Sequence, residues 1–421
     1  MFGKNRKRTE LITGIDIGST AVRVAVGQLG IDMQGKSQLH FVGLCEVPAE
    51  GVHKGAITSI EEVVSSISHA LEQTERLVGM PIEHAWIGLT GTNTIIQESK
   101  GVVAVAKTDG EIASEDVDRA VDAARMVATP LNYDIIHVIP RRFCVDGQTG
   151  IKDPIGMTGI RLEVDTQMIY GLTAHMKTIT KAVYRTGIDI DDLVLSIFAT
   201  GEVVATSRQK ELGVAVVNIG GSTTSLVVYE EGEIIHTAIF PIGGEHVTND
   251  LAIGLRISID VAEQVKITYG QCTKKGLIKK ERVNLLDLGG SESEEVYREY
   301  IVDIVSARVA EILEKVDKEL TKVDRSGRLP SGVIFTGGGA KISGLVDLAK
   351  EVLCLPAGLG YPVDLQSTTE KISDIGFATA VGLVQWGANL HESGGHKRLL
   401  SLRQGGNILT QVKKIFKSLI P

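Results

Sequence analysis

Two segments far apart in the chain share one pattern of hydrophobic and polar positions. In residues 14–26, an apolar strand that carries Asp16 leads into a Gly-Ser-Thr turn and then into a second alternating strand. Residues 216–229 repeat this pattern, with Asn218 in place of the aspartate and one extra glycine in the turn. The repeat predicts that the chain contains two related halves.

The turns of both hairpins consist of small residues, and so does a third loop that follows the apolar run 332–335. Backbone N–H groups in such turns can surround an anion, and Ser/Thr hydroxyls add donors to phosphate oxygens. We expect these loops to hold a phosphate chain, with Asp16 binding Mg²⁺ through water. A single such turn is also compatible with a plain β-hairpin. The residues concerned are Gly18, Ser19, Thr20, Gly220, Gly221, Ser222, Thr223, Gly337, Gly338 and Gly339.

A helical pattern follows the second hairpin, from about residue 251 to 269, and ends at Gly270. Glu263 and Lys266 are three residues apart on it and share a face. Such a pair can hold ribose hydroxyls, or it can be a surface ion pair worth a few tenths of a kcal/mol. The sequence leaves both interpretations open.

The composition is that of a soluble globular protein. The 421 residues suffice for about three domains. The net charge of −8 provides no overall basic field, so we expect no nucleic-acid partner. Four widely spaced cysteines predict reduced thiols in a cytosolic protein. No secretory signal and no apolar run of membrane-spanning length is found, so any membrane contact should be local.

The C-terminal residues suggest such a local contact. Residues 391–406 are polar and rich in glycine, which is typical of a flexible linker. In a helix over 407–421, one arc is apolar and three lysines lie opposite. This helix is suited to an anionic membrane surface, and docking on its own domain is the alternative. The membrane residues are Ile408, Leu409, Val412, Lys413, Lys414, Ile415, Phe416, Lys417, Leu419 and Ile420.

These motifs together resemble the actin-like ATPase superfamily, which includes actin, Hsp70 and sugar kinases. The match comprises the two hairpins, the Gly-Gly-x-x-x-Thr-x-Asp segment that begins at Gly243 and Gly244, the Glu263/Lys266 helix and the glycine loop. The Asp-Pro-x-Gly-Met-x-Gly-x-Arg segment within 151–164 is similar to that of the cell-division protein family FtsA. The resemblance covers about residues 10–421.

The resemblance implies a duplicated, ribonuclease H-like and actin-like α/β fold of two lobes, with an inserted subdomain 1C and a C-terminal amphipathic helix. The expected parts are subdomain 1A at 1–83, 166–196 and 375–390, 1C at 84–165, 2A at 197–250 and 331–374, 2B at 251–330, the linker at 391–406 and the membrane helix at 407–421.

The resemblance also implies ATP with Mg²⁺ in the cleft between the lobes. Asp16 and Asn218 are the candidate catalytic residues. The superfamily normally has an aspartate where this chain has Asn218, and an amide brings no charge to the metal or the attacking water. We therefore expect ATP binding with slow or absent hydrolysis.

The family resemblance implies a protein at the cytoplasmic face of the cell membrane, at the division septum. It would polymerise, tether the ring of the tubulin-like protein FtsZ to the membrane and recruit later division proteins. Arg308 and Glu311 match a pair that the family uses to hold the C-terminal peptide of FtsZ, although a solvated ion pair is the simpler interpretation. A small-molecule kinase of the superfamily and an adaptor like the pilus protein PilM are the alternatives.

Overall fold

The computed structural model describes residues 11–31, 37–91, 94–126, 129–278, 280–290, 295–363 and 365–392. The membrane helix expected over 407–421 and all but the first two residues of the expected linker lie outside this range. Among the described residues, no helix has the length and apolar character needed to cross a membrane.

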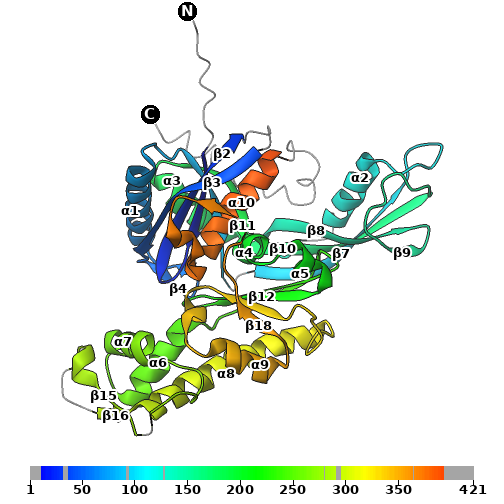
Figure 1. Ribbon diagram of the computed structural model, residues 1–421. Coiled ribbons are helices and arrows are strands. Elements are labelled where there is room, and N and C mark those ends of the chain that lie inside the picture. Colours follow the sequence, from blue (N-terminus) through cyan, green and yellow to red (C-terminus); the bar gives the residue numbers. More distant parts are fainter. Residues whose placement is uncertain are drawn as a thin grey trace, which may run out of the picture.

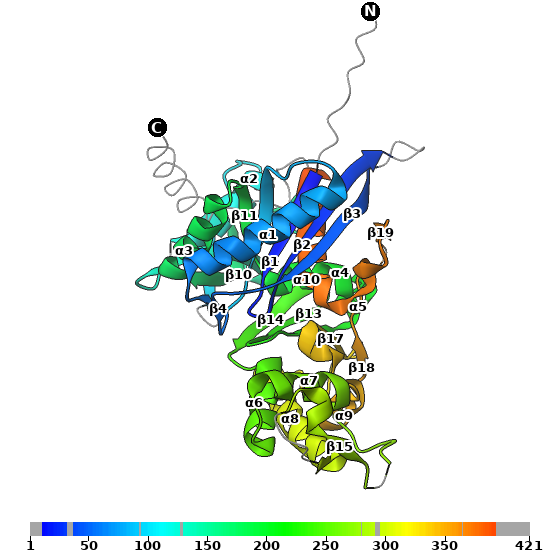
Figure 2. The same ribbon diagram turned by 90° about the vertical axis from the view of Figure 1, so that its left-hand side faces the viewer.

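The first lobe is a six-stranded sheet between two layers of helices (Figures 1 and 2). Helices α1 (Ile60–Val78) and α3 (Thr173–Arg185) cover one face, and α4 (Ser196–Val204) and α10 (Ala378–Glu392) cover the other. The strand order is β11 (Asp189–Leu195), β6 (His84–Leu89), β1 (Leu11–Ile17), β2 (Ala21–Ile31), β3 (Ser37–Pro48) and β19 (Gln366–Ser367). Two short strands, β4 (Val52–His53) and β5 (Ala56–Ile57), form a separate hairpin.

Both faces of this sheet are buried, which explains why its strands are almost continuously apolar. Val22, Val24 and Ala25 of β2 all have no exposed surface. Helices α4 and α10 approach closely, because a Cβ on Gly382 would lie only 2.0 Å from the backbone oxygen of Ala199. A larger residue at Gly382 would force α10 away from α4.

The second lobe repeats the arrangement on a five-stranded sheet. The hairpin of β12 (Val214–Ile219) and β13 (Thr224–Glu230) has the same antiparallel form as β1–β2. Strand β12 also has a parallel neighbour, β17 (Val333–Thr336), as β1 has β6. The predicted duplication is thus seen in the strand pairing. The order is β14 (Glu233–Phe240), β13 (Thr224–Glu230), β12 (Val214–Ile219), β17 (Val333–Thr336) and β18 (Ala357–Leu359).

The two lobes share a core through alternate residues of β12. Val214 and Val216 face the first lobe, whereas Ala215 and Val217 face the helices of the second lobe. Those helices are α6 (Gly244–Leu255), α7 (Ile259–Tyr269), α8 (Arg298–Lys322) and α9 (Leu345–Leu353). A two-stranded sheet of β15 (Arg282–Asn284) and β16 (Glu295–Tyr297) lies beside them, and α5 (Ser207–Leu212) precedes β12.

The prediction of a single helix over 251–269 is wrong. Two helices, α6 and α7, occupy this stretch and its upstream flank, and Arg256 between them adopts a left-handed conformation with φ +56°. The following Ser258 caps α7 by accepting a hydrogen bond from the backbone N–H of Val261. The predicted stop at Gly270 is confirmed as the C-cap of α7.

The insertion is a separate four-stranded antiparallel sheet with one helix and its own small core, and it extends from the side of the first lobe (Figure 1). Its strand order is β7 (Thr94–Ala104), β10 (Arg161–Leu172), β8 (Tyr133–Val145) and β9 (Gln148–Ile151), and its helix is α2 (Ser114–Arg125). Buried Asp116 in the first turn of α2 accepts hydrogen bonds from the backbone N–H of the N-cap residue Ala113 and from that of Ala106, after β7.

Five expected boundaries need correction. The insertion does not start at 84, since β6 pairs with β1 and β11 in the first-lobe sheet, and it continues beyond 165 along β10. The start of the second lobe at 197 is too early, because α4 belongs to the first-lobe core. The chain returns to the first lobe before 375, since β19 pairs with β3. Helix α10 also extends to Glu392, two residues into the expected linker.

Candidate functional site

The two hairpin turns and the glycine loop surround one cavity between the lobes. Its lining includes many of the residues that the sequence pattern singled out, namely Asp16, Gly18, Ser19, Thr20, Asn218, Gly220, Gly221, Thr223, Gly337 and Gly338. They come from the ends of β1, β12 and β17 and from the turns after them. Sequence segments more than 300 residues apart therefore contribute to one site.

The two turns have matching backbone geometry. In the first turn, the N–H of Gly18 donates to the oxygen of Ala21 (3.0 Å), and in the second, the N–H of Gly220 donates to the oxygen of Thr223 (2.8 Å). A side chain on Gly18 would collide with this oxygen, at 2.8 Å from its Cβ. This close approach gives a physical reason for the glycine before each turn.

The turns from opposite lobes come into contact. A Cβ on Gly221 would lie 2.6 Å from Cγ2 of Thr20. The cavity between them has a volume of about 60 Å³, whereas small-molecule sites usually measure about 300–1,000 Å³. The lobes are therefore closed on each other at this point, and a larger ligand would need them to separate.

Asp16 lies at the mouth of the first turn and is almost fully buried, with 8% of its surface exposed. Burial raises the pKa of its carboxyl group to about 6, and the positive charge of Arg23 partly opposes this shift. Arg23 is directly opposite Asp16 in the register of β1 and β2. It also forms an ion pair with Glu46, at 2.5 Å between Nε and Oε2.

Arg23 was missed in the sequence analysis, although it lines the cavity. Its place in the register opposite Asp16 was a signal that could have identified it. The cavity is also lined by Gly55, Thr90, Gly376 and Thr379, which lie outside the predicted motifs. No local sequence pattern marks these residues, because separate loops and α10 bring them to the site.

Asn218 is held in the cavity by a hydrogen bond. Its amide Nδ2 donates to Oγ1 of Thr379 at 3.2 Å, and that hydroxyl is within 3.0 Å of Oγ1 of Thr200. The side chain thus joins the second hairpin to α10 of the first lobe. A carboxylate at this position would need the Thr379 hydroxyl to donate instead.

Ser222 does not line the cavity. It is buried, and its Oγ donates to Oε2 of Glu245 at 2.6 Å. Glu245 in turn donates its backbone N–H to the oxygen of Gly221 (2.8 Å). The side chain of Ser222 therefore fixes the second turn against the start of α6, and its predicted contact with phosphate is not supported by this geometry.

Gly243, Gly244, Glu263, Lys266 and Gly339 lie beside the cavity. The N–H of Gly244 donates to the oxygen of Gly220 (2.9 Å), and a Cβ on Gly244 would be 3.7 Å from Cα of Gly339. Nζ of Lys266 lies 2.6 Å from Oε2 of Glu263 and 3.3 Å from the backbone oxygen of Gly244. The ion pair is thus present and borders the glycine turns, and its contact with ribose hydroxyls stays a prediction.

Asp16 is the one carboxylate of the described residues that lines the cavity. No cluster of three or more His, Cys, Asp or Glu side chains able to hold a metal ion occurs in the described ranges. Mg²⁺ commonly uses one or two carboxylates together with phosphate oxygens and water. The donor set at Asp16 is compatible with a metal that arrives with a phosphate ligand.

Arg308 and Glu311 lie on α8, outside the residues that form the cavity. Arg308 binds both carboxylate oxygens of Asp250, at 2.5 Å from Nε and 2.9 Å from Nη2, and its Nη1 donates to Glu311. Asp250 is the aspartate of the Gly-Gly-x-x-x-Thr-x-Asp segment. Through its ion pair with Arg308 it connects α6 with α8. It is not among the residues that line the cavity.

Comparison of the sequence with protein families gives two matches. Residues 215–382 match the family described as cell division protein FtsA, and residues 91–170 match the SHS2 domain inserted in FtsA. The second match agrees with the corrected bounds of the insertion, which starts after β6 and ends within β10.

Relatives named cell division protein FtsA match nearly the whole chain. The protein from Pseudomonas aeruginosa is 34% identical over 385 residues, which cover 91% of each chain. The Bacillus subtilis protein is 37% identical over 377 residues, covering 90% of this chain and 83% of its own length. The Escherichia coli K12 protein is 30% identical and covers 91% of this chain and 92% of its own.

Comparison with solved structures shows the fold. The PilM–PilN type IV pilus biogenesis complex aligns with a TM-score of 0.65 at 16% identity, over 89% of this chain and 98% of the other. MreB5 of Spiroplasma citri bound to ADP aligns with a TM-score of 0.54 at 12% identity, over 92% and 99%. The predicted actin-like two-lobed fold is confirmed, and the PilM alternative is supported at the level of the fold alone. With two family matches and relatives that are 30–37% identical over about nine-tenths of its length, the chain belongs to the FtsA family of cell division proteins.

Proposed function

We propose that the chain binds ATP with Mg²⁺ between its two lobes and uses it to control assembly at the membrane. The observation that carries the proposal is the contact between two matching turns from opposite lobes, at Thr20 and Gly221. Each turn offers backbone N–H groups and hydroxyls, which are suited to phosphate oxygens. A triphosphate held by both turns would link the lobes.

Each lining residue has a role that follows from its chemistry. Ser19, Thr20 and Thr223 provide hydroxyl donors, and Arg23 provides the positive charge for the phosphates. Asp16 holds Mg²⁺ through water once its carboxyl group is deprotonated. The metal would neutralise charge on the phosphates. Gly243, Gly244 and the loop at Gly337, Gly338 and Gly339 form the adenosine side, where Glu263 and Lys266 bind the ribose.

ATP would act as a conformational ligand, because the cavity of about 60 Å³ is too small to contain it without movement of the lobes. A ligand shifts a protein toward the conformation that it binds better. An ATP-bound chain would therefore have a different lobe angle from the one seen here. This change would favour self-assembly into a filament.

Hydrolysis would be slow or absent. Asn218 faces the cavity with an amide that is already donating to Thr379. It supplies neither a base for the attacking water nor charge for the metal. Asp16 is the remaining carboxylate, and its role is binding.

The family membership supports an adaptor role at the septum, on the cytoplasmic face of the membrane. In this role the chain binds the C-terminal peptide of FtsZ through α8 near Arg308 and Glu311, and other division proteins join the assembly. Residues 407–421 attach it to anionic lipid, since their pattern places apolar residues opposite three lysines.

Co-sedimentation with anionic vesicles in the presence of ATP tests the attachment. We expect the full chain to pellet with the vesicles and a chain that ends at Gly405 to remain in solution. Replacing Lys413, Lys414 and Lys417 with Gln distinguishes the contribution of the positive charge from that of the apolar arc, since this variant keeps the arc and loses the charge. Equal pelleting of the full and shortened chains would contradict the proposed attachment.

The FtsZ site is tested with the C-terminal peptide of FtsZ and two charge reversals on α8. Glu311 is the acidic residue paired with Arg308, whereas Glu314 is exposed on the same helix and has no such contact. We expect Glu311→Lys to weaken peptide binding and Glu314→Lys to leave it unchanged. Equal affinities of both variants and the unaltered chain would remove the reason for placing the peptide there.

A further inference from the structure

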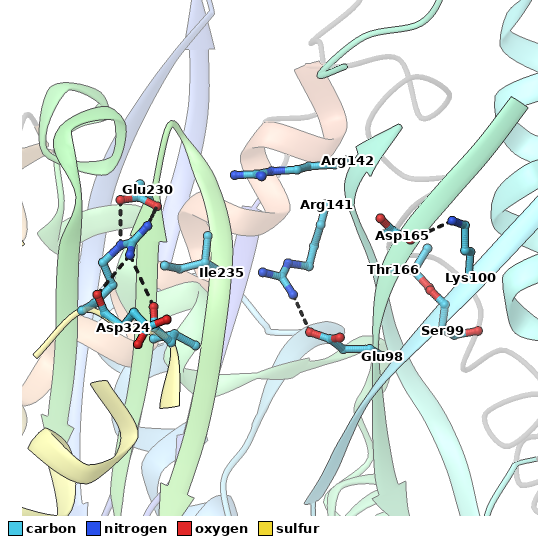
Figure 3. A pocket seen from close by; sticks show the side chains of 12 residues that line it. Glu98, Ser99, Lys100, Arg141, Arg142, Asp165, Thr166, Glu230, Ile235 and Asp324 are labelled. Carbon is cyan, nitrogen blue, oxygen red and sulfur yellow. Dashed lines mark hydrogen bonds and ion pairs between the residues drawn. The ribbon is translucent and has the colours of Figure 1, made fainter. Parts of the chain in front are cut away.

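A polar groove of about 570 Å³ separates the insertion from the second lobe. Strands β7, β8 and β10 of the insertion form one wall, and the β13–β14 hairpin and the segment after α8 form the other (Figure 3). Its volume lies within the range of about 300–1,000 Å³ that is usual for ligand sites. It shares no lining residue with the cavity between the lobes.

The two walls are tied together outside the groove. Nζ of Lys152, in the loop after β9, donates to the backbone oxygen of Glu231 in the second lobe at 2.9 Å. The same amine lies 3.5 Å from Oε1 of Glu211. The groove is therefore preformed in this conformation and does not depend on a ligand to draw its walls together.

Most of the charges in the groove are neutralised by neighbours. Arg325 binds both carboxylate oxygens of Glu230, at 2.8 and 2.6 Å. Nη1 of Arg141 lies 2.7 Å from Glu98, and Nζ of Lys100 lies 2.5 Å from Glu163. These pairs leave little positive charge for a ligand.

Arg142 is different. Within the described part of the chain, its guanidinium group has no hydrogen bond and no ion pair, and its side chain is exposed. Figure 3 shows it extending from β8 toward the second lobe, above Arg141. Asp165 stands opposite it in the register of β8 and β10 but forms no ion pair with it. A guanidinium group in this position can accept a carboxylate or phosphate through two parallel hydrogen bonds.

The acidic residues of the groove indicate which of these anions it can bind. Glu98, Asp165, Glu230 and Asp324 also line the groove and would repel a ligand with many adjacent negative charges, such as a nucleic acid or a polyphosphate. Ile235 and Val323 add apolar surface. Ile235 is the extra residue of a β-bulge on β14, so it has no partner on β13. A ligand whose carboxylates are separated by apolar side chains would fit this lining.

We propose that the groove binds an acidic peptide segment, one carboxylate of which pairs with the guanidinium group of Arg142. The segment lies between β8 and β14, and an apolar side chain contacts Ile235. This site shares no residue with the nucleotide cavity, and it does not include Arg308 or Glu311 on α8.

The test uses a fluorescein-labelled peptide of two Glu-Val-Glu-Gly repeats, titrated with the full chain at low ionic strength and followed by anisotropy. Arg142→Gln should weaken binding at least tenfold. The matched control is Arg161→Gln, which removes an exposed arginine of the same insertion outside the groove. Arg142→Lys should bind with intermediate affinity, because lysine keeps the charge without the paired donors.

Three outcomes would overturn the proposal. The first is no binding of the acidic peptide by the unaltered chain. The second is equal loss in Arg142→Gln and Arg161→Gln, which would mean general charge attraction. The third is equal binding of a peptide with Lys in place of each Glu, or displacement by pyrophosphate at the same concentration as the acidic peptide, which would indicate a site of different chemistry. Thermal melting of each variant shows that loss of binding is not loss of fold.

Discussion

Arg23 lies directly opposite Asp16 across the β1–β2 hairpin, and both side chains line the cavity between the lobes. One is positively charged, and the other is a carboxylate whose pKa burial raises to about 6. In the proposed function, Arg23 binds phosphate and Asp16 binds the metal, so one hairpin would supply both groups. This arrangement leads to the first prediction.

Arg23→Gln should weaken ATP binding by about 10- to 100-fold, since a hydrogen bond to a charged group contributes about 1.5–3 kcal/mol. Isothermal titration with ATP and Mg²⁺ measures the effect. Arg76→Gln is the control, because Arg76 is a largely exposed arginine at the end of α1. If both variants bind ATP like the unaltered chain, Arg23 does not contact the phosphates.

Asp16→Asn should change how stability depends on pH. Burial raises the pKa of Asp16 from 3.8 to about 6 in the folded chain. The folded state therefore holds this proton more tightly, and its contribution to the free energy of unfolding falls as pH rises from about 4 to about 6. Without nucleotide and Mg²⁺, the free energy of unfolding of the uncharged Asn variant should therefore gain about 3 kcal/mol on that of the unaltered chain between pH 4 and pH 7.

Chemical denaturation of both chains across this pH window gives the difference in unfolding free energy. Groups other than residue 16 titrate in both chains and largely cancel in the comparison. A difference that stays constant from pH 4 to pH 7 would show that the carboxyl group of Asp16 keeps an ordinary pKa in the folded chain.

Gly337→Ala and Gly338→Ala form a matched pair in the glycine loop. Gly337 has φ +88°, and a Cβ there would lie 2.1 Å from Oδ1 of Asn218. A Cβ on Gly338 meets no atom within 4 Å. Gly337→Ala should lower stability by about 1–3 kcal/mol, whereas Gly338→Ala should change it by less than about 0.5 kcal/mol. Thermal melting distinguishes them, and equal melting temperatures would contradict the loop geometry.

Asn218→Asp should raise the rate of ATP hydrolysis about tenfold or more, because a carboxylate can orient the metal and the attacking water. Phosphate release is the measurement. Asn218→Ala is the control that removes the amide without adding charge. A rate for the Asp variant that does not exceed those of the Ala variant and the unaltered chain would mean that another feature limits hydrolysis.

Much of the fold followed from local patterns. The hairpins at Asp16 and Asn218 alternate with a period of two and have small turn residues, so strands, turns and duplication were all predictable. The helix break at Arg256 was not, because the left-handed conformation there belongs to a residue with no local preference for it. The limits of the insertion depend on the pairing of β6 with β1, which local sequence patterns do not reveal because the two strands are distant in the chain.

Most of the site was predictable because the same local patterns mark its turns. The prediction failed where the direction of a side chain decides its role. Ser222 belongs to the same turn as Thr223, but its hydroxyl points to Glu245 instead of the cavity. Thr379 comes from α10, more than 150 residues after Asn218, and only the packing of the lobes brings the two together. Neither fact is encoded in the spacing of a motif.

In the proposed binding mode, both lobes hold one ATP molecule. Titration of the full chain with ATP and Mg²⁺ tests it most directly, using Ser19→Ala in the first lobe, Thr223→Ala in the second and the double variant. We expect each single change to weaken binding and the two effects to be non-additive in the double variant, because both groups contact one ligand. ATP binding that is unaffected by either change, or the absence of binding by the unaltered chain, would contradict it.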